Sequence, residues 1–373
     1  MLTKKVIFYV PDLNRITNNY EDLFDRFNIY AQNLKKTNPE IFFTILCGVQ
    51  NNIGFSLIAK KYPNINFCIT KETRDVFKQV FYLWRYLITD KNSRKIIIPA
   101  NNYDNYFALI FLRMFFKYKI QIALHGEINK FGSVGIKFML KQLWLIFTFN
   151  FSDSIRVVSI DQVNDLQRYY RLDKRKFVVC PIPIDFTKFI KLKKDSDHMS
   201  IGYVGRFHAE RDPISLSRIL NNDLLSLNKF NVYAIGSGSE KEKFIQNLKN
   251  RANISVYSIE AISQSELLNY WPKIGVLLST APKESYGLAI REAVLNNTFV
   301  IAKKSQGAIS LQKLVGENFV RIYNTEIEAA NLILDFLNHN WYSGKSPNFS
   351  KIYEEEQSKS LKSLVTSWSN SLN

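Results

Sequence analysis

Short apolar runs alternate along the chain with mixed, helix-forming segments, and each run ends in a Gly, a Pro or a polar turn. In the second half these runs cover residues 200–204, 230–235 and 274–279, and their apolar, β-branched content predicts buried strands. A helical segment follows each turn. Strands and helices that alternate in this way predict an α/β fold with mostly parallel, doubly wound sheets.

The first half has the same pattern. An apolar run predicts a first strand over residues 4–10. The final run, 350–373, is polar, but Leu361, Leu364, Val365 and Trp368 recur along it at helical spacing, which predicts an amphipathic terminal helix.

A chain of 373 residues is long for one domain and sufficient for two. Residues 188–197 are rich in Lys and Asp and lie between two halves that are rich in strands, so they read as a linker. We therefore expect domains at residues 1–188 and 189–345, followed by the terminal helix at 346–373.

Residues 282–293 carry the most informative chemistry, because two carboxylates bracket a turn that contains a glycine and leads into a helix. A helix that begins near Ser285 points its unsatisfied N–H groups and positive dipole end at the preceding loop, where a phosphate or a polarised hydroxyl could bind. Glu284 would lie in that loop. Glu292 lies one turn beyond Leu288 on the same helix face, so both carboxylates could hold vicinal hydroxyls. The alternative is that Glu284 only caps the helix and Glu292 is a solvated surface residue.

Two other strand ends carry related features. Gly205 and Arg206 follow the strand at 200–204, and Arg211 lies five residues further on. Gly205 would let the backbone approach a ligand, and two guanidinium groups suit a diphosphate. Gly236 and Gly238 form a flexible turn after the next strand, at the position where parallel α/β sheets bind ligands.

These four features, in this order, resemble the retaining glycosyltransferases of family 4, over most of residues 200–330. The resemblance implies the GT-B architecture, with two Rossmann-like domains facing across a cleft. The N-terminal domain would bind the acceptor, the C-terminal domain the nucleotide-sugar donor, and the terminal helix would cross back to the first domain.

The resemblance also implies roles for single residues. Arg206 and Arg211 would bind the donor diphosphate. Glu284 would hydrogen-bond hydroxyls of the transferred sugar, and Glu292 would hold the ribose. The other implied donor contacts are the N–H groups of Tyr286, Gly287 and Leu288 near sugar and phosphate, and Gly236, Gly238 and Ile262 near the nucleoside.

The N-terminal half resembles the family less closely. Residues 11–15 follow the first strand but lack the glycine pair of many family members, and this puts the usual loop contact with the donor phosphates in doubt. Residues 120–127 resemble the strand that ends in His-Gly in this family, so the resemblance implies that His125 approaches the sugar. The alternative is that His125 is a loop histidine bonded to a backbone carbonyl. Residues 155–159 and 177–185 resemble the last strands of the acceptor domain and the turn into the second domain.

No metal and no cofactor beyond the donor are expected. The Asp195-Ser196-Asp197 sequence looks like a metal-binding Asp-x-Asp, but it precedes a strand and is surrounded by lysines, which favours a solvated linker. Cys47, Cys68 and Cys180 are far apart in sequence, which fits a reducing compartment and gives no zinc spacing.

The net charge of +17 points to an anionic partner. Nucleic acid is not expected, because zinc-finger spacings, RNA-binding aromatic signatures and dense basic blocks are missing. Residues 112–119 and 136–147 mix aromatic side chains with cations as interfacial helices do, and neither is long enough to span a bilayer. We therefore expect a cytoplasmic protein that lies on an anionic membrane, on the inner face of a bacterial plasma membrane. The alternative is that these aromatic side chains only pack on a sheet.

The resulting hypothesis is a retaining glycosyltransferase that moves a sugar from a nucleoside diphosphate onto a growing glycan carried on a lipid, in O-antigen, lipopolysaccharide or capsule synthesis. A bacterial source is suggested by a composition rich in Lys, Asn, Ile and Phe. Two alternatives stay open: a sugar-nucleotide epimerase of the same fold, and a degenerate, non-catalytic subunit. Departures from the family pattern at residues 297–298 and 305–308 favour the non-catalytic subunit. The presence of all four charged site residues opposes it: Arg206, Arg211, Glu284 and Glu292.

Overall fold

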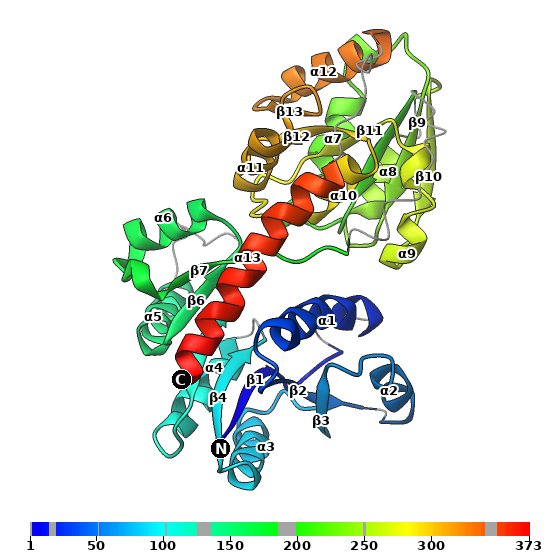
Figure 1. Ribbon diagram of the computed structural model, residues 1–373. Coiled ribbons are helices and arrows are strands. Elements are labelled where there is room, and N and C mark those ends of the chain that lie inside the picture. Colours follow the sequence, from blue (N-terminus) through cyan, green and yellow to red (C-terminus); the bar gives the residue numbers. More distant parts are fainter. Residues whose placement is uncertain are drawn as a thin grey trace. The chain divides into compact units, whose positions relative to one another are not determined.

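The computed structural model describes residues 2–14, 20–50, 52–100, 103–124, 136–185, 199–248, 251–339 and 349–373. The chain forms two compact units (Figure 1): unit 1 comprises Met1–Asp185 and Glu356–Asn373, and unit 2 comprises Phe186–Glu355. The expected domain boundaries after residues 188 and 345, the linker at 188–197 and the Asp-x-Asp sequence lie outside the described residues.

Unit 1 is built on a seven-stranded sheet in the order β3-β2-β1-β4-β5-β6-β7, and its neighbouring strands pair in parallel. The strands are β1 (Thr3–Val10), β2 (Ile41–Val49), β3 (Asn66–Lys71), β4 (Ser93–Pro99), β5 (Lys119–Ala123), β6 (Ser154–Val157) and β7 (Phe177–Val179). The helices are α1 (Tyr20–Thr37), α2 (Asn52–Ala59), α3 (Val76–Thr89), α4 (Tyr103–Arg113), α5 (Ile136–Phe151), α6 (Ile160–Tyr170) and α13 (Phe349–Leu372), of which the part from Glu356 onward belongs to this unit.

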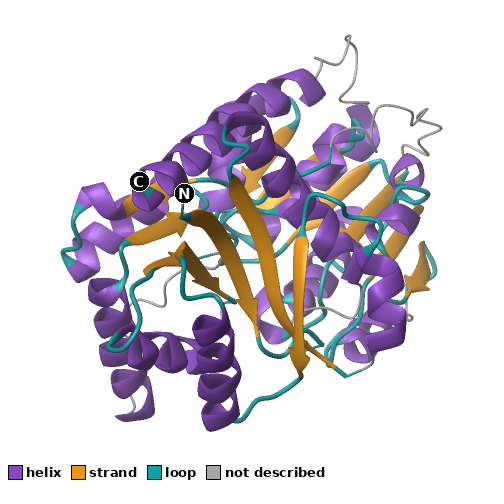
Figure 2. Cartoon of the chain, turned by 60° about the horizontal axis from the view of Figure 1, so that its bottom comes forward, coloured by secondary structure: helices purple, strands orange, loops and turns teal. Residues whose placement is uncertain are grey.

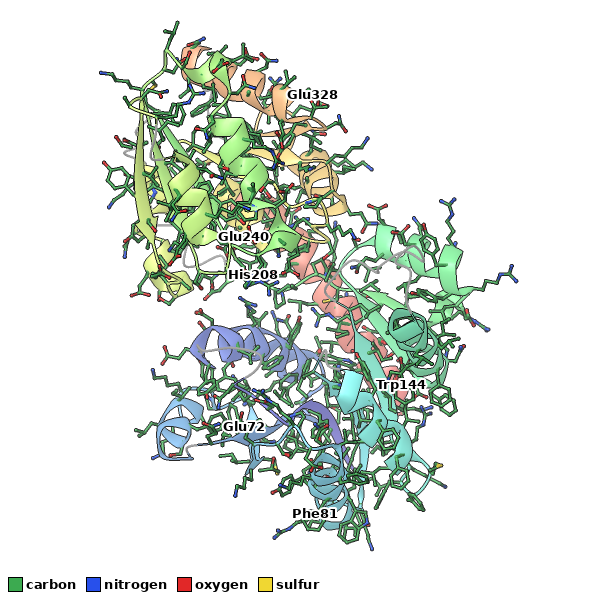
Figure 3. All side chains as sticks on the ribbon, turned by 180° about the vertical axis from the view of Figure 1, so that it is seen from behind. Glu72, Phe81, Trp144, His208, Glu240 and Glu328 are labelled. Carbon is green, nitrogen blue, oxygen red and sulfur yellow. The ribbon has the colours of Figure 1, made fainter. Side chains whose placement is uncertain are left out.

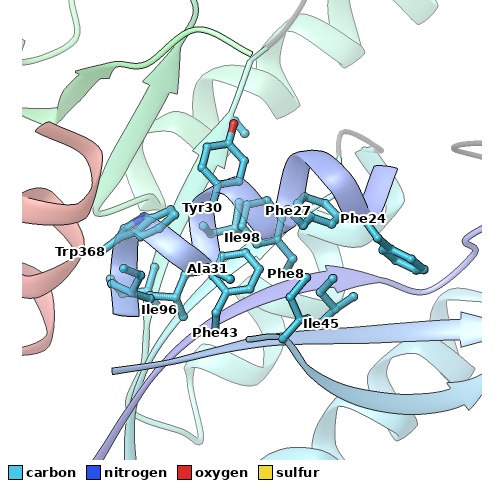
Figure 4. Close-up of a cluster of buried hydrophobic side chains, with 14 of the residues drawn as sticks. Phe8, Phe24, Phe27, Tyr30, Ala31, Phe43, Ile45, Ile96, Ile98 and Trp368 are labelled. Carbon is cyan, nitrogen blue, oxygen red and sulfur yellow. The ribbon is translucent and has the colours of Figure 1, made fainter. Parts of the chain in front are cut away.

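Helices cover both faces of this sheet (Figure 2). Buried side chains of α1, α2 and α13 form one core with β1, β2 and β4, and those of α3, α4, α5 and α6 form a second core on the other face. In the first core, Trp368 of α13 lies 6.1 Å from the ring of Tyr30 and 6.2 Å from that of Phe43 (Figure 4). The indole Nε1 of Trp368 donates a hydrogen bond to Gln121 Oε1 at 2.9 Å.

Unit 2 is built on a six-stranded parallel sheet in the order β10-β9-β8-β11-β12-β13. The strands are β8 (Ser200–Val204), β9 (Phe230–Ile235), β10 (Ile254–Ile259), β11 (Val276–Ser279), β12 (Phe299–Lys303) and β13 (Val320–Tyr323). The helices are α7 (Pro213–Leu220), α8 (Lys241–Leu248), α9 (Gln264–Leu267), α10 (Leu288–Leu295), α11 (Gln306–Val315) and α12 (Glu326–His339).

The predicted fold class is confirmed: each unit is a doubly wound parallel sheet. The predicted strands correspond to β1, β5, β6, β7, β8, β9 and β11, and the predicted terminal helix is α13, in which Leu361, Leu364, Val365 and Trp368 are buried.

Two local predictions need correction. Residues 112–119 do not form an interfacial helix, because α4 ends at Arg113, a turn follows, and β5 begins at Lys119. The helix expected near Ser285 begins later, at Leu288, after the N-cap residue Gly287. At Gly287 φ is 76°, a left-handed conformation that ends the loop and that glycine adopts without strain. The segment 136–147, by contrast, lies within α5.

Candidate functional site

The predicted donor residues of unit 2 follow four strands at one edge of the sheet. β8 lies between β9 and β11, so the strand order reverses between β8 and β11. Open α/β sheets bind ligands at the carboxyl ends of their strands beside such a reversal. The predicted residues lie after β8 (Gly205, Arg206, Arg211), after β9 (Gly236, Gly238), after β10 (Ile262), after β11 (Glu284, Tyr286, Gly287) and in α10 (Leu288, Glu292).

Glycines bring the loops after β8 and β9 into close contact. The N–H of Gly205 donates to the carbonyl of Ile235, and that of Phe207 donates to the carbonyl of Ser237 at 2.9 Å. A Cβ at Gly236 would lie 1.9 Å from the carbonyl oxygen of Gly205, and one at Gly238 would lie 2.3 Å from that of Phe207. No side chain fits at either position, so the two loops form one tightly packed backbone layer at the sheet edge.

Arg211 and Glu284 form an ion pair between the loops after β8 and β11. The side chain of Thr280 strengthens this junction, because its Oγ1 donates to the carbonyl of Arg211 at 2.9 Å. Burial lowers the pKa of Arg211, and the charge of Arg206 lowers it further. Two guanidinium groups that repel each other in this way favour an anion near both.

Arg206 is not part of that pair. Its side chain is 64% exposed and its Nη2 lies 2.6 Å from Glu210 Oε1. The loop after β8 is held by Tyr203, whose hydroxyl donates to the carbonyl of Arg206 at 3.0 Å. His208, labelled in Figure 3, lies with its Nδ1 3.4 Å from Ser239 Oγ of the next loop.

Glu284 is a loop residue with three separate contacts. Besides the pair with Arg211, its Oε1 accepts a hydrogen bond from the N–H of Gly287 at 3.2 Å, and its backbone carbonyl accepts one from the N–H of Gly307 at 2.7 Å. The Glu284 carboxylate thus bonds the N-cap residue itself, and among the described residues α10 has no side-chain cap in its first turn. The N–H of Gly287, predicted to face the donor, is bonded to this carboxylate.

Glu292 is only 6% exposed, so the alternative of a solvated surface residue is wrong. Its Oε1 accepts a hydrogen bond from Nε2 of Gln264 at 2.7 Å, which ties α10 to the first residue of α9. Ile262 lies just before, in the half-buried loop between β10 and α9. Gln264 was not predicted from the sequence, although the capping box formed by Ser263 and Glu266 locates the start of α9 and thus its first-turn position.

Arg291 was also missed, and it is 1% exposed. Its Nε donates to the carbonyl of Tyr286 at 3.0 Å, its Nη2 donates to Ser310 Oγ at 3.3 Å, and its guanidinium carbon lies 4.0 Å from the centroid of the Tyr286 ring. Its Nη1 has no hydrogen-bond partner among the described residues. The side chain thus fixes the turn from Glu284 to Leu288 from behind.

A buried lysine completes the edge near β10. Lys241 is 6% exposed, and its Nζ donates at 2.8 Å both to the carbonyl of Ile259 and to Glu260 Oε1. Its N–H donates to the carbonyl of Gly238 at 3.2 Å. The cation therefore holds the glycine turn against the end of β10.

Unit 1 has a separate polar cluster at the carboxyl edge of its own sheet. Asp12 is 4% exposed and accepts a hydrogen bond from Arg74 Nε at 2.6 Å, while Asn14 Nδ2 donates to Glu72 Oε2 at 2.7 Å. Burial and the neighbouring Asp12 carboxylate raise the pKa of Glu72. Asp12 and Asn14 lie in the loop where the resemblance would place a glycine pair. Polar side chains therefore occupy this loop in place of the glycines. His125 lies outside the described residues and stays a prediction.

Two general features concern the described residues only. No group of three His, Cys, Asp or Glu side chains gathers there as a metal site, and none of the described helices is long and apolar enough to cross a membrane. Cys47, Cys68 and Cys180 are free thiols, and burial raises the pKa of Cys47 to about 12.

Comparisons with known proteins identify the architecture. No protein-family model and no curated protein matches the sequence. Solved structures match nearly the whole chain: sucrose-phosphate synthase from Thermosynechococcus elongatus has a TM-score of 0.70 at 14% identity, covering 98% of each chain. The lipopolysaccharide outer core galactosyltransferase WaaB, in its apo form, has a TM-score of 0.66 at 12% identity, covering 98% of this chain and 99% of the other. Anabaena Alr3699/HepE in complex with UDP-glucose has a TM-score of 0.62 at 13% identity, covering 99% and 98%.

At these identities the likeness establishes the fold. The chain has the GT-B architecture that was expected from residues 200–330, with two Rossmann-like units of seven and six parallel strands.

Proposed function

We propose that this protein is a glycosyltransferase that moves a sugar from a nucleoside diphosphate to a glycan acceptor. The observation that carries the proposal is the Arg211–Glu284 ion pair between the loops before α7 and α10, with Glu292 on α10, beside the strand-order reversal of unit 2. A cationic group, a helix N-terminus and two carboxylates suit a sugar linked to a diphosphate. Two solved structures of the same fold support this choice: one is named a galactosyltransferase, and the other is a complex with UDP-glucose.

We assign each group a separate task. Arg211 and Arg206 neutralise the diphosphate and stabilise it as it leaves the sugar. A diphosphate that binds Arg211 competes with Glu284 for the guanidinium, so donor binding frees the Glu284 carboxylate to accept sugar hydroxyls. Glu292, oriented by Gln264, accepts hydrogen bonds from the ribose.

We further propose that the transfer retains the anomeric configuration and needs no metal, with the oxocarbenium-like sugar stabilised by the departing phosphate and its cationic partners. No enzyme carboxylate acts as a nucleophile in this scheme. Unit 1 would hold the acceptor, with His125 near the sugar, and the acceptor would be a growing surface glycan carried on a lipid. The likeness to a lipopolysaccharide galactosyltransferase supports this acceptor class.

The first test is thermal stabilisation by UDP-, GDP-, ADP- and TDP-sugars in the presence of EDTA. We expect one nucleotide class to raise the melting temperature of the wild type, and Arg211→Ala and Glu292→Gln to lose that shift. Arg175→Ala is the control, because Arg175 is exposed and pairs only locally with Asp173. A protein that responds to no sugar nucleotide would contradict the proposal.

Transfer itself is tested with the donor so identified, a lipid-linked acceptor and NMR of the product's anomeric centre. Retention with loss of rate in Glu284→Ala is the expected result. Conversion of the donor sugar without any acceptor would identify an epimerase instead. Binding without any turnover would identify a non-catalytic subunit.

A further inference from the structure

The outer surface of α3, α4 and α5 in unit 1 is unusually apolar. Eleven of the 20 exposed large hydrophobic side chains among the described residues belong to these helices and to the turn after α4. We call this set the α3–α5 face: Phe77, Phe81, Trp84, Phe107, Phe111, Met114, Phe115, Leu140, Leu143, Phe147 and Phe151. Patches of this kind mark interaction sites.

The rings of this face contact one another across helices. Phe107 of α4 lies 6.2 Å from Phe111 on the same helix and 6.4 Å from Trp144 of α5, measured between ring centroids. Trp144 in turn lies 5.4 Å from Phe147, which lies 4.3 Å from Phe151. On α3, Phe81 and Trp84 stack at 6.1 Å, and Figure 3 labels Phe81 and Trp144. Stacking preorganises these side chains even though they are exposed, so the face needs little ordering when it binds a partner.

A cationic hollow adjoins the face. It has a volume of about 750 Å³, and its lining includes five cations, Arg94, Lys95, Arg113, Lys117 and Lys119, one carboxylate side chain, Asp153, and residues 370–373. Arg94 is bonded to the carbonyl of Leu372 at 3.0 Å and Lys95 is buried, so Arg113, Lys117 and Lys119 are the cations that face the hollow. Asp153 is already paired with Arg113 at 3.0 Å and with Lys119 at 3.2 Å. The residues 116–119 that line the hollow directly follow Met114 and Phe115, so the apolar face and the cationic hollow are continuous along the chain.

These segments are strongly cationic. Residues 76–89, 103–119 and 136–151 contain seven Lys and Arg and one carboxylate, Asp104. Two copies of the chain joined symmetrically through this face would bring an excess of cations together with few carboxylates to pair them. An anionic bilayer offers both complements at once, because aromatic and aliphatic side chains enter the headgroup region while Lys and Arg contact lipid phosphates.

We infer that the α3–α5 face and its cationic hollow form the surface through which this protein docks on an anionic lipid bilayer. The inference is independent of the proposed chemistry, since it uses no residue of the donor site. It also changes the membrane expectation from sequence: the turn after α4 and the exposed side chains of α3 contribute, whereas residues 112–119 are not a helix.

The test is co-sedimentation of the purified chain with vesicles of phosphatidylcholine alone and of equal parts phosphatidylcholine and phosphatidylglycerol. We expect binding to the anionic vesicles, weakened by salt. The double variant Met114→Ser/Phe115→Ser should lower the partition coefficient by about tenfold or more, because both side chains are about two-thirds exposed and lose apolar contact with lipid. Lys117→Gln should lower it about fivefold on anionic vesicles only.

Leu227→Ser and Lys243→Gln are the matched controls, because both residues are exposed in unit 2, and Leu227 is 96% exposed. Each variant's melting temperature shows whether it is folded. Wild type that stays in the supernatant with anionic vesicles overturns the inference. Binding by the double variant that equals that of the wild type also overturns the inference. A third contrary result is a dimer in sedimentation velocity that the double variant abolishes, with no binding of either protein to vesicles. Sugar-nucleotide binding is measured without vesicles, so either proposal can fail alone.

Discussion

At the scale of single residues, the site edge of the unit 2 sheet depends on a glycine without room for a side chain and on a fully buried arginine. Gly236 has no room for a Cβ, since one would lie 1.9 Å from the carbonyl oxygen of Gly205. Arg291 is buried under the turn that carries Glu284, and it holds the carbonyl of Tyr286. Neither residue needs to touch a donor, yet both determine where the donor-facing groups lie.

Gly236→Ala should lower the free energy of unfolding by at least about 1–3 kcal/mol, because the added methyl group forces the loops after β8 and β9 apart. Gly316→Ala is the control: φ at Gly316 is also positive, at 92°, but nothing lies within 4 Å of an added Cβ. Urea unfolding measures both variants. If both variants lose the same free energy of unfolding, the effect at Gly236 comes from backbone strain alone and not from the contact with Gly205.

Arg291→Lys should lower the free energy of unfolding by about 1–3 kcal/mol, because lysine keeps the charge but cannot stack on Tyr286 and bond Ser310 together. It should also reduce the thermal shift produced by the donor. Arg321→Lys provides the comparison, since the Nε of Arg321 likewise donates to a carbonyl, that of Glu317, but in an exposed place. If the two substitutions have the same effect, burial of Arg291 has no special role.

At the scale of elements, unit 2 is held together by polar contacts between helices as well as by its core. Glu326 at the start of α12 accepts hydrogen bonds from Arg218 Nε at 2.8 Å and from Ser215 Oγ at 2.7 Å, both on α7. The bond from Arg218 lowers the pKa of Glu326. The bonded residues Ser215 and Glu326 are 111 positions apart in the sequence, so this contact joins two distant helices.

The pH dependence of this contact has a definite sign. Because the folded-state pKa of Glu326 is lowered, its contribution to stability is present above the ordinary glutamate value of about 4.3 and is lost as the pH falls below it. Glu326→Gln should therefore be less stable than the wild type at neutral pH and equally stable in strong acid. Melting curves across this range measure the effect, with Glu242→Gln, an exposed α8 residue, as the control. If the stability difference between the wild type and Glu326→Gln is the same at every pH, the ionised carboxylate is excluded as its source.

At the scale of the whole molecule, each unit has its own core, and the terminal helix contributes to that of unit 1. Leu361, Leu364, Val365 and Trp368 of α13 are buried in the same cluster as β1 and β2. Trp368 is 0% exposed and bonds Gln121 of β5 through its indole nitrogen. The last helix therefore packs on a sheet whose first strand begins 346 residues before the helix does.

Trp368→Ala should destabilise unit 1 by about 3–5 kcal/mol, because it opens a cavity and leaves the Gln121 side chain without its donor. Trp84→Ala, at a side chain that is 43% exposed, should change stability by about 0.5 kcal/mol or less. Hydrogen exchange resolves the two units: protection should fall in peptides of β1, β2 and α1 and persist in β8 to β13. Uniform loss in both units would mean that they unfold together.

Much of the fold could be predicted from the sequence because the signals are local. Apolar runs that end in Gly or Pro located β8, β9 and β11, and the alternation of strands with helices indicated parallel sheets. The same signals placed Gly205, Gly236 and Glu284 in loops at strand ends. They failed where two patterns look alike: residues 112–119 have the composition of an interfacial helix but form a helix end, a turn and a strand start.

The sequence by itself therefore determined the fold class, the seven strands named above and the residues at their ends, because periodicity and turn chemistry act over a few residues. The tertiary structure alone decided which of those residues meet. Arg211 pairs with Glu284 across 73 residues, and Gln264 orients Glu292 across 28, because the strand order brings distant strand ends to one edge. Burial of Arg291 and exposure of the α3–α5 face likewise depend on which helix covers which sheet, and that is settled only when the whole core packs.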